Sequence, residues 1–133
     1  MASAKPPIFV ADGSYIFALN VGNLASEGGN IRFGLGTIAQ IDAETGALVR
    51  LISGSRYDLS GATAMAVMDQ DLFVADAGAD AVTEIDPATG ALVKLLDGDQ
   101  YSFVGPDGEA TWGHHLYVAN GQGNSVTDIE LRS

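Results

Sequence analysis

The sequence contains no cysteine in its 133 residues. This absence excludes disulfide bonds, thiolate catalysis and zinc sites with cysteine ligands. The compartment stays open, because a chain without cysteine suits both oxidising and reducing surroundings. No window approaches about 18 uninterrupted apolar residues, so we expect no transmembrane helix.

The first ten residues, MASAKPPIFV, lack an apolar run long enough for a signal peptide. As given, the chain reads as soluble and unexported. A start upstream of Met1 is left open, and the localisation is undetermined.

Cations are scarce. Six Lys and Arg residues stand against 17 Asp and Glu residues, for a net charge of −11. Nucleic acid and anionic membrane surfaces are therefore disfavoured as partners, because both bind through Lys and Arg. A solvated acidic surface that keeps the protein in solution explains the charge more simply.

Signatures of chemistry are absent as well. There is no nucleophile motif, no phosphate-cradling glycine loop and no metal-binding signature, so we expect neither a metal nor a cofactor. What the chain does have is an apolar fraction of 47%, enough for the core of one domain. Its 17 glycines and four prolines indicate many tight turns rather than long helices.

The chain is organised around an internal repeat. The stretch IDPATGALVKLLDG (residues 85–98) copies IDAETGALVRLISG (residues 41–54) at an offset of 44 residues. Aligning residues 41–84 with residues 85–128 gives 17 identities in 44 positions, more than composition alone produces. A period of this length, made of short apolar runs and turn residues, is typical of a blade-type β-repeat.

The apolar runs predict strands. Each run is about five residues long, is rich in Val, Ile, Phe, Tyr and Thr, and is closed by a turn signal. In many runs, the residues at odd and at even positions are both apolar. Because successive residues of a strand point to opposite faces, this pattern indicates sheets that are buried on both faces. The sequence predicts eleven strands: 8–11, 15–19, 37–42, 47–52, 62–68, 72–75, 81–86, 91–96, 108–112, 116–119 and 126–131.

The segments LFVADAGADAVTEIDPATGALVKLLDG (residues 72–98) and LYVANGQGNSVTDIE (residues 116–130) resemble the YVTN/NHL-like β-propeller repeats of bacterial proteins. The resemblance implies an all-β fold of four-stranded antiparallel blades, about two and three-quarter of them, in an incomplete ring. The first blade would cover about residues 5–54 with an inserted loop at 21–36. The second would cover about 61–98, and the third about 105–131 without its last strand.

In such blades, the connections between the second and third strands share one face with the connections to the next blade. Propellers usually hold ligands on that face. Long loops also often carry binding, which adds the polar residues of the insertion. The predicted ligand or partner face therefore comprises seven residues: Asn20, Asn23, Glu27, Asn30, Arg32, Asp76 and Asn120.

Three other features favour structural roles over chemical ones. DAGAD (residues 76–80) looks like a calcium loop but lacks the further ligands and the terminal bidentate Glu, so a turn is the better interpretation. His114 and His115 are adjacent and should point to opposite faces, as surface turn residues do. Recurring Tyr57 and Tyr101 predict packing between blades, and we expect Trp112 in the core.

Three functional hypotheses remain. The first is a non-enzymatic propeller module that binds a ligand or protein partner through one face. The second is a propeller-type lyase or hydrolase, which the two histidines on the opposite side disfavour. The third is a fragment of a larger propeller with no activity of its own.

An incomplete stack of blades leaves an apolar face bare at each end. Two chains would supply about six blades, within the usual range for a closed ring. We therefore expect the partner to be a second copy, in a ring-closing homodimer, or else the missing blades of a longer chain.

Overall fold

A computed structural model describes residues 8–11, 13–20, 24–27, 30–33, 36–57, 59 and 61–131. Within these ranges the chain forms thirteen strands and two short 3₁₀ helices, η1 and η2. None of the described segments is a helix long and apolar enough to cross a membrane. The elements are β1 (Ile8–Ala11), β2 (Tyr15–Asn20), β3 (Leu24–Glu27), β4 (Asn30–Phe33), β5 (Thr37–Asp42), β6 (Leu48–Ile52), η1 (Ser55–Tyr57), β7 (Ala62–Met68), β8 (Asp71–Asp76), β9 (Ala81–Asp86), β10 (Ala91–Leu96), η2 (Asp99–Tyr101), β11 (Pro106–Trp112), β12 (His115–Asn120) and β13 (Ser125–Glu130).

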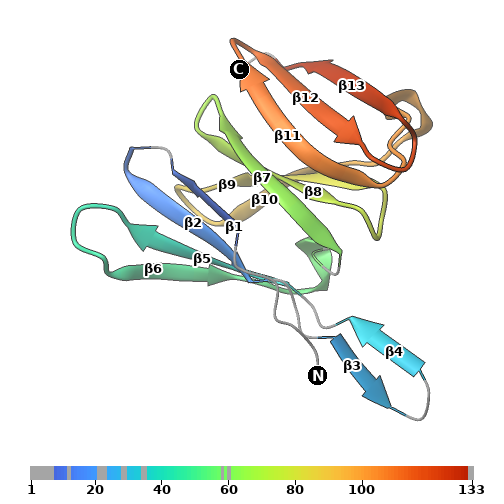
Figure 1. The fold of residues 1–133 in the computed structure, drawn as a ribbon. Helices are drawn as coiled ribbons and strands as arrows, with labels where there is room; N and C mark the ends of the chain where they lie inside the picture. The colour runs from blue at the N-terminus through green and yellow to red at the C-terminus, as the bar shows by residue number, and fades with distance from the viewer. Residues whose placement is uncertain are drawn as a thin grey trace.

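Three antiparallel sheets lie side by side like the blades of a propeller (Figure 1). Sheet 1 has the order β1-β2-β5-β6, sheet 2 has β7-β8-β9-β10, and sheet 3 has β11-β12-β13. The first strands of the sheets are neighbours in space, since β7 contacts both β1 and β11. The described sheets do not close into a ring, which confirms the predicted all-β, incomplete propeller.

The middle sheet shows why these runs form strands. In β8 every residue from Leu72 to Asp76 is buried, and in β9 every residue from Ala81 to Ile85 is buried. A strand can bury both parities only when its sheet has a neighbour on each face. The runs of consecutive apolar residues in the sequence therefore predict that the sheets stack face to face.

The repeated Thr-Gly turns join the third strand of a sheet to the fourth. Gly46 and Gly90 each have a φ of +77°, a left-handed conformation that glycine adopts without steric cost. An aspartate opens each turn: Asp42 Oδ1 accepts the amide of Glu44 at 2.8 Å, and Asp86 Oδ1 accepts that of Ala88 at 2.9 Å.

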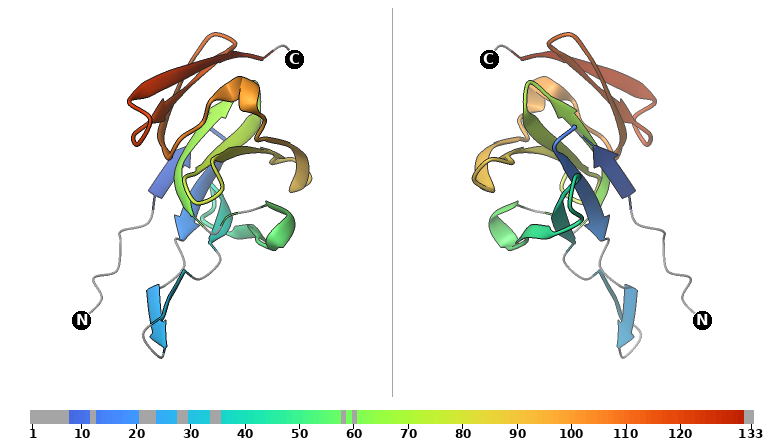
Figure 2. Two further views of the ribbon diagram at one scale, coloured as in Figure 1. Left: turned by 90° about the vertical axis from the view of Figure 1, so that its right-hand side faces the viewer. Right: turned by 90° about the vertical axis from the view of Figure 1, so that its left-hand side faces the viewer.

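The insertion is not the loop that the sequence predicts. It contains a two-stranded hairpin, β3–β4, that projects from the end of sheet 1 (Figure 2). After a Gly-Gly pair, polar and apolar residues alternate in NIRF (residues 30–33), a strand pattern that the repeat alignment did not take into account. The described chain thus has thirteen strands rather than eleven, and β11 begins at Pro106 instead of Gly108.

Candidate functional site

Each sheet has a leading face, which points to the next sheet along the chain, and a trailing face, which points to the preceding one. Strand register and the 44-residue repeat identify equivalent positions on these faces. On the leading faces of sheets 1, 2 and 3, the equivalent residues are Phe17, Phe73 and Tyr117 on the second strands and Ile38, Val82 and Val126 on the third strands.

The first interface lies between sheets 1 and 2. Its apolar cluster includes Phe17, Leu19 and Ile38 from sheet 1, each fully buried, and Leu72 and Ile85 from sheet 2.

Polar groups close the outer end of the first interface. Gln40 Nε2 donates to the carbonyl of Pro87 at 2.9 Å, and Arg50 Nη2 donates to the carbonyl of Ala88 at 3.2 Å. Both carbonyls belong to the turn between β9 and β10 of sheet 2. This turn therefore caps the polar residues of the sheet before it.

The second interface lies between sheets 2 and 3 and repeats the same construction. Thr83 Oγ1 donates to the carbonyl of Tyr57 at 2.8 Å in the first interface, and Thr127 Oγ1 donates to the carbonyl of Tyr101 at 2.7 Å in the second. The two tyrosines thus recur for packing between sheets, as the sequence predicts. Tyr101 also stacks on Phe103, with ring centroids 5.2 Å apart.

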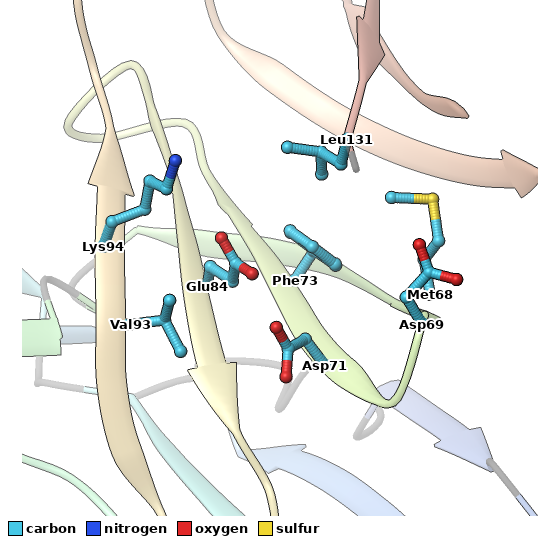
Figure 3. Close-up of a pocket in the computed structure, with 8 residues that line it drawn as sticks. All are labelled: Met68, Asp69, Asp71, Phe73, Glu84, Val93, Lys94 and Leu131. Atoms are coloured by element: carbon cyan, nitrogen blue, oxygen red, sulfur yellow. The ribbon is translucent and has the colours of Figure 1, made fainter. Parts of the chain in front are cut away.

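The outer end of the second interface is open and forms a pocket of about 280 Å³ (Figure 3). Glu84 and Lys94 stand here at the positions that Gln40 and Arg50 occupy in the first interface. Leu131 of sheet 3 borders the pocket from the other side. The pocket is lined by Met68, Asp69, Asp71, Phe73, Glu84, Val93, Lys94 and Leu131.

The pocket perturbs one carboxyl group. Loss of hydration on burial, with the neighbouring Asp71 as a hydrogen-bond partner and like charge, raises the pKa of Glu84 to about 7, against the opposing charge of Lys94. Oε1 of Glu84 is buried and has no hydrogen-bond partner. A carboxyl group in this state can hold or release a proton near neutral pH.

A second perturbed carboxyl group lies on β11. Both oxygens of Glu109 are buried, and neither accepts a hydrogen bond of good geometry. Burial raises the pKa of Glu109 well above its usual range, and the backbone amide of Ala75 opposes this shift. The repeat places Met65 at the equivalent position of sheet 2.

The leading face of sheet 3 is uncovered. Val126 is 65% exposed, whereas the equivalent Ile38 and Val82 are fully buried. Trp112 is 77% exposed, whereas Met68, its equivalent in sheet 2, is 5% exposed. The expectation of a core Trp112 is therefore wrong for the single chain, because no described sheet covers the face on which it lies.

No described sheet covers the trailing face of sheet 1 either. Leu48 is 59% exposed, whereas the equivalent Leu92 of sheet 2 packs against the first apolar cluster. Ile41 is partly exposed, whereas the equivalent Ile85 is fully buried. Each end of the stack thus presents the residue types that form the two internal interfaces.

Two of the predicted face residues are engaged within the fold. Asp76 is fully buried, and its Oδ1 accepts the amides of Gly78 and Ala79. Asn120 is 1% exposed and binds the amide of Val104 through Oδ1 at 3.2 Å. Neither side chain is accessible to a ligand from solvent, although the turns themselves lie where the repeat predicts.

The other predicted face residues are more open or lie elsewhere. Asn20 is exposed at the end of β2. Asn23 lies outside the described residues, and Glu27, Asn30 and Arg32 belong to the β3–β4 hairpin, where only the backbone is described. Of the seven residues, the structure thus describes the side chains of Asn20, Asp76 and Asn120 alone, and the ligand or partner face stays a prediction.

Both histidines bind carboxylates. His114 Nδ1 lies 2.8 Å from Asp69 Oδ2 of sheet 2, and His115 Nδ1 lies 2.8 Å from Asp128 Oδ1 of its own sheet. They point to different partners, as expected for adjacent residues at a strand end. No group of three potential metal ligands exists among the described side chains, and Asp80 of the DAGAD turn accepts the amide of Gly105 at 2.8 Å.

Sequence reasoning missed the pocket and the buried Glu109. The signal was present in the repeat, where Gln40 is replaced by Glu84 and Met65 by Glu109. Such exchanges of a neutral residue for an acid at a buried repeat position mark the places where one interface differs from another.

No protein-family model and no curated protein sequence matches this chain. Two solved structures are similar to it. The computationally designed Ika4 protein is 13% identical with a TM-score of 0.61, over 99% of this chain and 94% of that one. The computationally designed Ika8 protein is 14% identical with a TM-score of 0.58, over 93% of this chain and 45% of that one. This chain thus spans less than half of the Ika8 chain, and at these identities the likeness shows the fold alone.

Proposed function

We propose that the chain is a non-enzymatic β-propeller module whose partner is a second copy of itself, bound through the two open sheet faces. The observation that carries this proposal is the 65% exposure of Val126 where the equivalent Ile38 and Val82 are fully buried. An apolar surface made of interface residues favours association in water.

The two open faces complement each other. The leading face of sheet 3 offers Tyr117, Val126 and Trp112, and the trailing face of sheet 1 offers Leu48 and Ile41. Leading and trailing faces already pack together twice within the chain, so a third contact of this kind requires no new geometry. It joins two chains head to tail.

Closure favours a dimer over an open array. A head-to-tail contact produces a filament unless the rotation closes on itself. Two chains supply about six sheets, within the range of about four to eight blades in known propellers. The kinship to YVTN/NHL-like propeller repeats belongs to the same proposal and rests on the repeat sequence.

Two other functions have less support. A chain that contributes blades to a longer propeller would use the same faces, and the partial coverage of Ika8 is compatible with that role. A propeller-type lyase or hydrolase would require convergent acid and base residues. His114 and Asp69 do come from adjacent sheets, but the side chain of His114 is largely exposed.

The oligomeric state tests the proposal. We expect the mass of a dimer by light scattering at micromolar concentration, and a blue shift of Trp112 emission as concentration rises. Leu48→Arg and Val126→Arg place a charge on each open face and should each give monomers. Val104→Arg is the matched control, because Val104 is also exposed, at 44%, but lies in a connection outside both faces.

A wild-type chain that is monomeric and melts cooperatively at these concentrations would contradict the proposal. A dimer that persists in both face variants and is lost in the Val104 control would also contradict it, because association would then use another surface.

A further inference from the structure

One acid distinguishes the interface between sheets 2 and 3 from the interface between sheets 1 and 2. Glu109 of β11 lies where the repeat places Met65 in the first interface, and Met65 belongs to the apolar cluster there. Strand β11 packs against β7 and β8 of sheet 2 (Figure 1). Both carboxyl oxygens of Glu109 are buried, and neither accepts a hydrogen bond of good geometry. An ionised Glu109 therefore opposes the packing of sheet 3 on sheet 2, because a buried charge is costly without full hydrogen bonding.

The strands around Glu109 offer it no free cation. Strand β7 contains no acidic or basic residue. On the other strands packed beside it, and on β11 itself, the acidic and basic residues are Asp71, Asp76, Asp107 and His115. Of these His115 alone is a base, and its Nδ1 lies 2.8 Å from Asp128 Oδ1. Lys94, on β10, pairs across the strands with Glu84 of its own sheet.

A second ionisable contact joins the same two sheets. In the turn between β11 and β12, His114 places Nδ1 2.8 Å from Oδ2 of Asp69, in the turn between β7 and β8. This contact is an ion pair while the imidazole is protonated and loses that attraction when the proton leaves. The equivalent residues in the first interface, Gln70 and Gly13, cannot form an ion pair. The other acids that border these turns are Asp71 on β8 and Glu130 on β13.

Both contacts respond to pH in the same direction. Burial raises the pKa of Glu109 well above its usual range, so packed sheet 3 holds this proton more firmly than a released sheet whose carboxyl group meets water. Loss of the proton from His114 removes its attraction to Asp69. A rise in pH therefore weakens the second interface at two places, and the equivalent residues of the first interface do not titrate.

We propose that sheet 3 is a pH-sensitive element of the fold, which packs on sheet 2 at low pH and is released from it as pH rises. Release means that β11, β12 and β13 open together while sheets 1 and 2 stay packed. A three-stranded sheet without a covered apolar face is not stable by itself, so its backbone hydrogen bonds open with it. The contacts lie within one chain, and the proposal is therefore separate from self-association.

Amide hydrogen exchange, followed by ¹H–¹⁵N NMR between pH 5.5 and pH 8 and corrected for intrinsic exchange, tests the proposal. At pH 8 the amides of β12, the central strand of sheet 3, should open with a smaller urea dependence than those of β5 and β9. Releasing one sheet exposes less surface than unfolding the whole chain. From pH 5.5 to pH 8 the opening constant of β12 should rise about tenfold or more, since one pKa unit between packed and released forms is worth a factor of ten.

Three variants assign the effect to its residues. Glu109→Gln removes the charge at nearly constant shape, and His114→Gln introduces the residue type of Gln70. Each should reduce the rise at β12, and the double variant should abolish most of it. His115→Gln is the matched control, because His115 binds a carboxylate of its own sheet and joins no two sheets. Circular dichroism confirms folding, and Glu109→Met, with the residue type of the equivalent position, replaces Glu109→Gln if that variant does not fold.

Several results would overturn the proposal. If β12 opens with the same urea dependence as β5 and β9 at every pH, sheet 3 unfolds only with the whole chain. An opening constant of β12 that is constant over this pH range, or a full rise in the double variant, would also contradict it. An equal loss of pH dependence in His114→Gln and His115→Gln would overturn the role of the contact between His114 and Asp69.

Discussion

The two interfaces between sheets are built from one repeat and yet end differently. Each has an apolar cluster and the same hydrogen bond from a threonine, Thr83 or Thr127, to the carbonyl of a tyrosine. Among the described residues, only the first is capped, where the turn of sheet 2 binds Gln40 and Arg50. The comparison shows that a sheet is sealed by the turn and fourth strand of the sheet that follows it.

The chemistry at the outer end follows from this difference. A buried amide such as Gln40 is satisfied when a carbonyl is placed beside it. The acid at the equivalent position, Glu84, opens instead on a pocket, and its pKa rises to about 7. The open end of a repeat array is thus also the place where a residue can titrate near neutral pH.

The largest expected effect is a difference in stability between equivalent truncations in the two apolar clusters. Phe17 and Phe73 are equivalent and are 0% and 1% exposed. Phe17→Ala leaves an enclosed cavity and should lower the free energy of unfolding by about 3–5 kcal/mol. Phe73→Ala enlarges a pocket that already exists, so solvent can fill the space and the loss should be smaller by about 1 kcal/mol or more.

Urea unfolding of both variants at one protein concentration measures this difference. Val104→Ala serves as the control, because Val104 is 44% exposed and its truncation should cost little. Equal losses for the two phenylalanine variants would mean that the second interface is as well sealed as the first.

The second effect concerns the acid that the second interface buries. Glu109→Met introduces the residue type of the equivalent Met65 and removes a buried carboxyl group that accepts no hydrogen bond of good geometry. We expect the free energy of unfolding at neutral pH to rise by about 1–3 kcal/mol. The exposed Glu44→Met is the control and should change it little.

The pH dependence gives this prediction its sign. Burial raises the pKa of Glu109 in the folded protein above its value in the unfolded chain. The free energy of unfolding is therefore higher at low pH, where the carboxyl group is protonated in both states, and it decreases as pH rises. The advantage of Glu109→Met should therefore shrink toward pH 4. An advantage that is constant from pH 4 to pH 8 would assign the effect to packing rather than to charge.

Much of the fold followed from the sequence because the repeat averages local signals over several copies. Strands β5, β7, β9 and β10 begin and end where predicted. The β3–β4 hairpin was missed because it occurs once and has no copy to align with. A local pattern without a repeat offers a weaker signal than one that recurs.

The candidate site was predicted less well, for a physical reason. The propeller resemblance places Asp76 and Asn120 on a ligand face, but both side chains are buried and accept backbone amides of the fold. Trp112 was assigned to the core because large aromatic residues are usually buried. Trp112 is equivalent in the repeat to the buried Met68, but the sequence alone does not show which sheet is left without a neighbouring sheet on its face.

The smallest expected effect is on the pH dependence of stability, and it compares the two interfaces at a single position. Glu84 and Gln40 are equivalent, and the pKa of Glu84 is raised from 4.5 to about 7 by burial and by Asp71. For an acid with a raised pKa, the unfolded state loses its proton first as pH rises. Stability is then highest below about pH 4.5 and decreases until the pH passes about 7.

Glu84→Gln gives the second interface the residue of the first and should remove this part of the pH dependence. We expect the decrease in the free energy of unfolding between pH 5 and pH 8 to become smaller by about 1 kcal/mol or less, because water in the pocket screens the charge. Denaturant unfolding at pH 5, 6, 7 and 8 measures it, with Asp107→Asn, at an exposed residue, as the control. A profile for Glu84→Gln that is parallel to the wild-type profile would show that Glu84 does not titrate in this range. The outer end of the second interface would then be as well satisfied as that of the first, and the difference between the two interfaces would be one of shape alone.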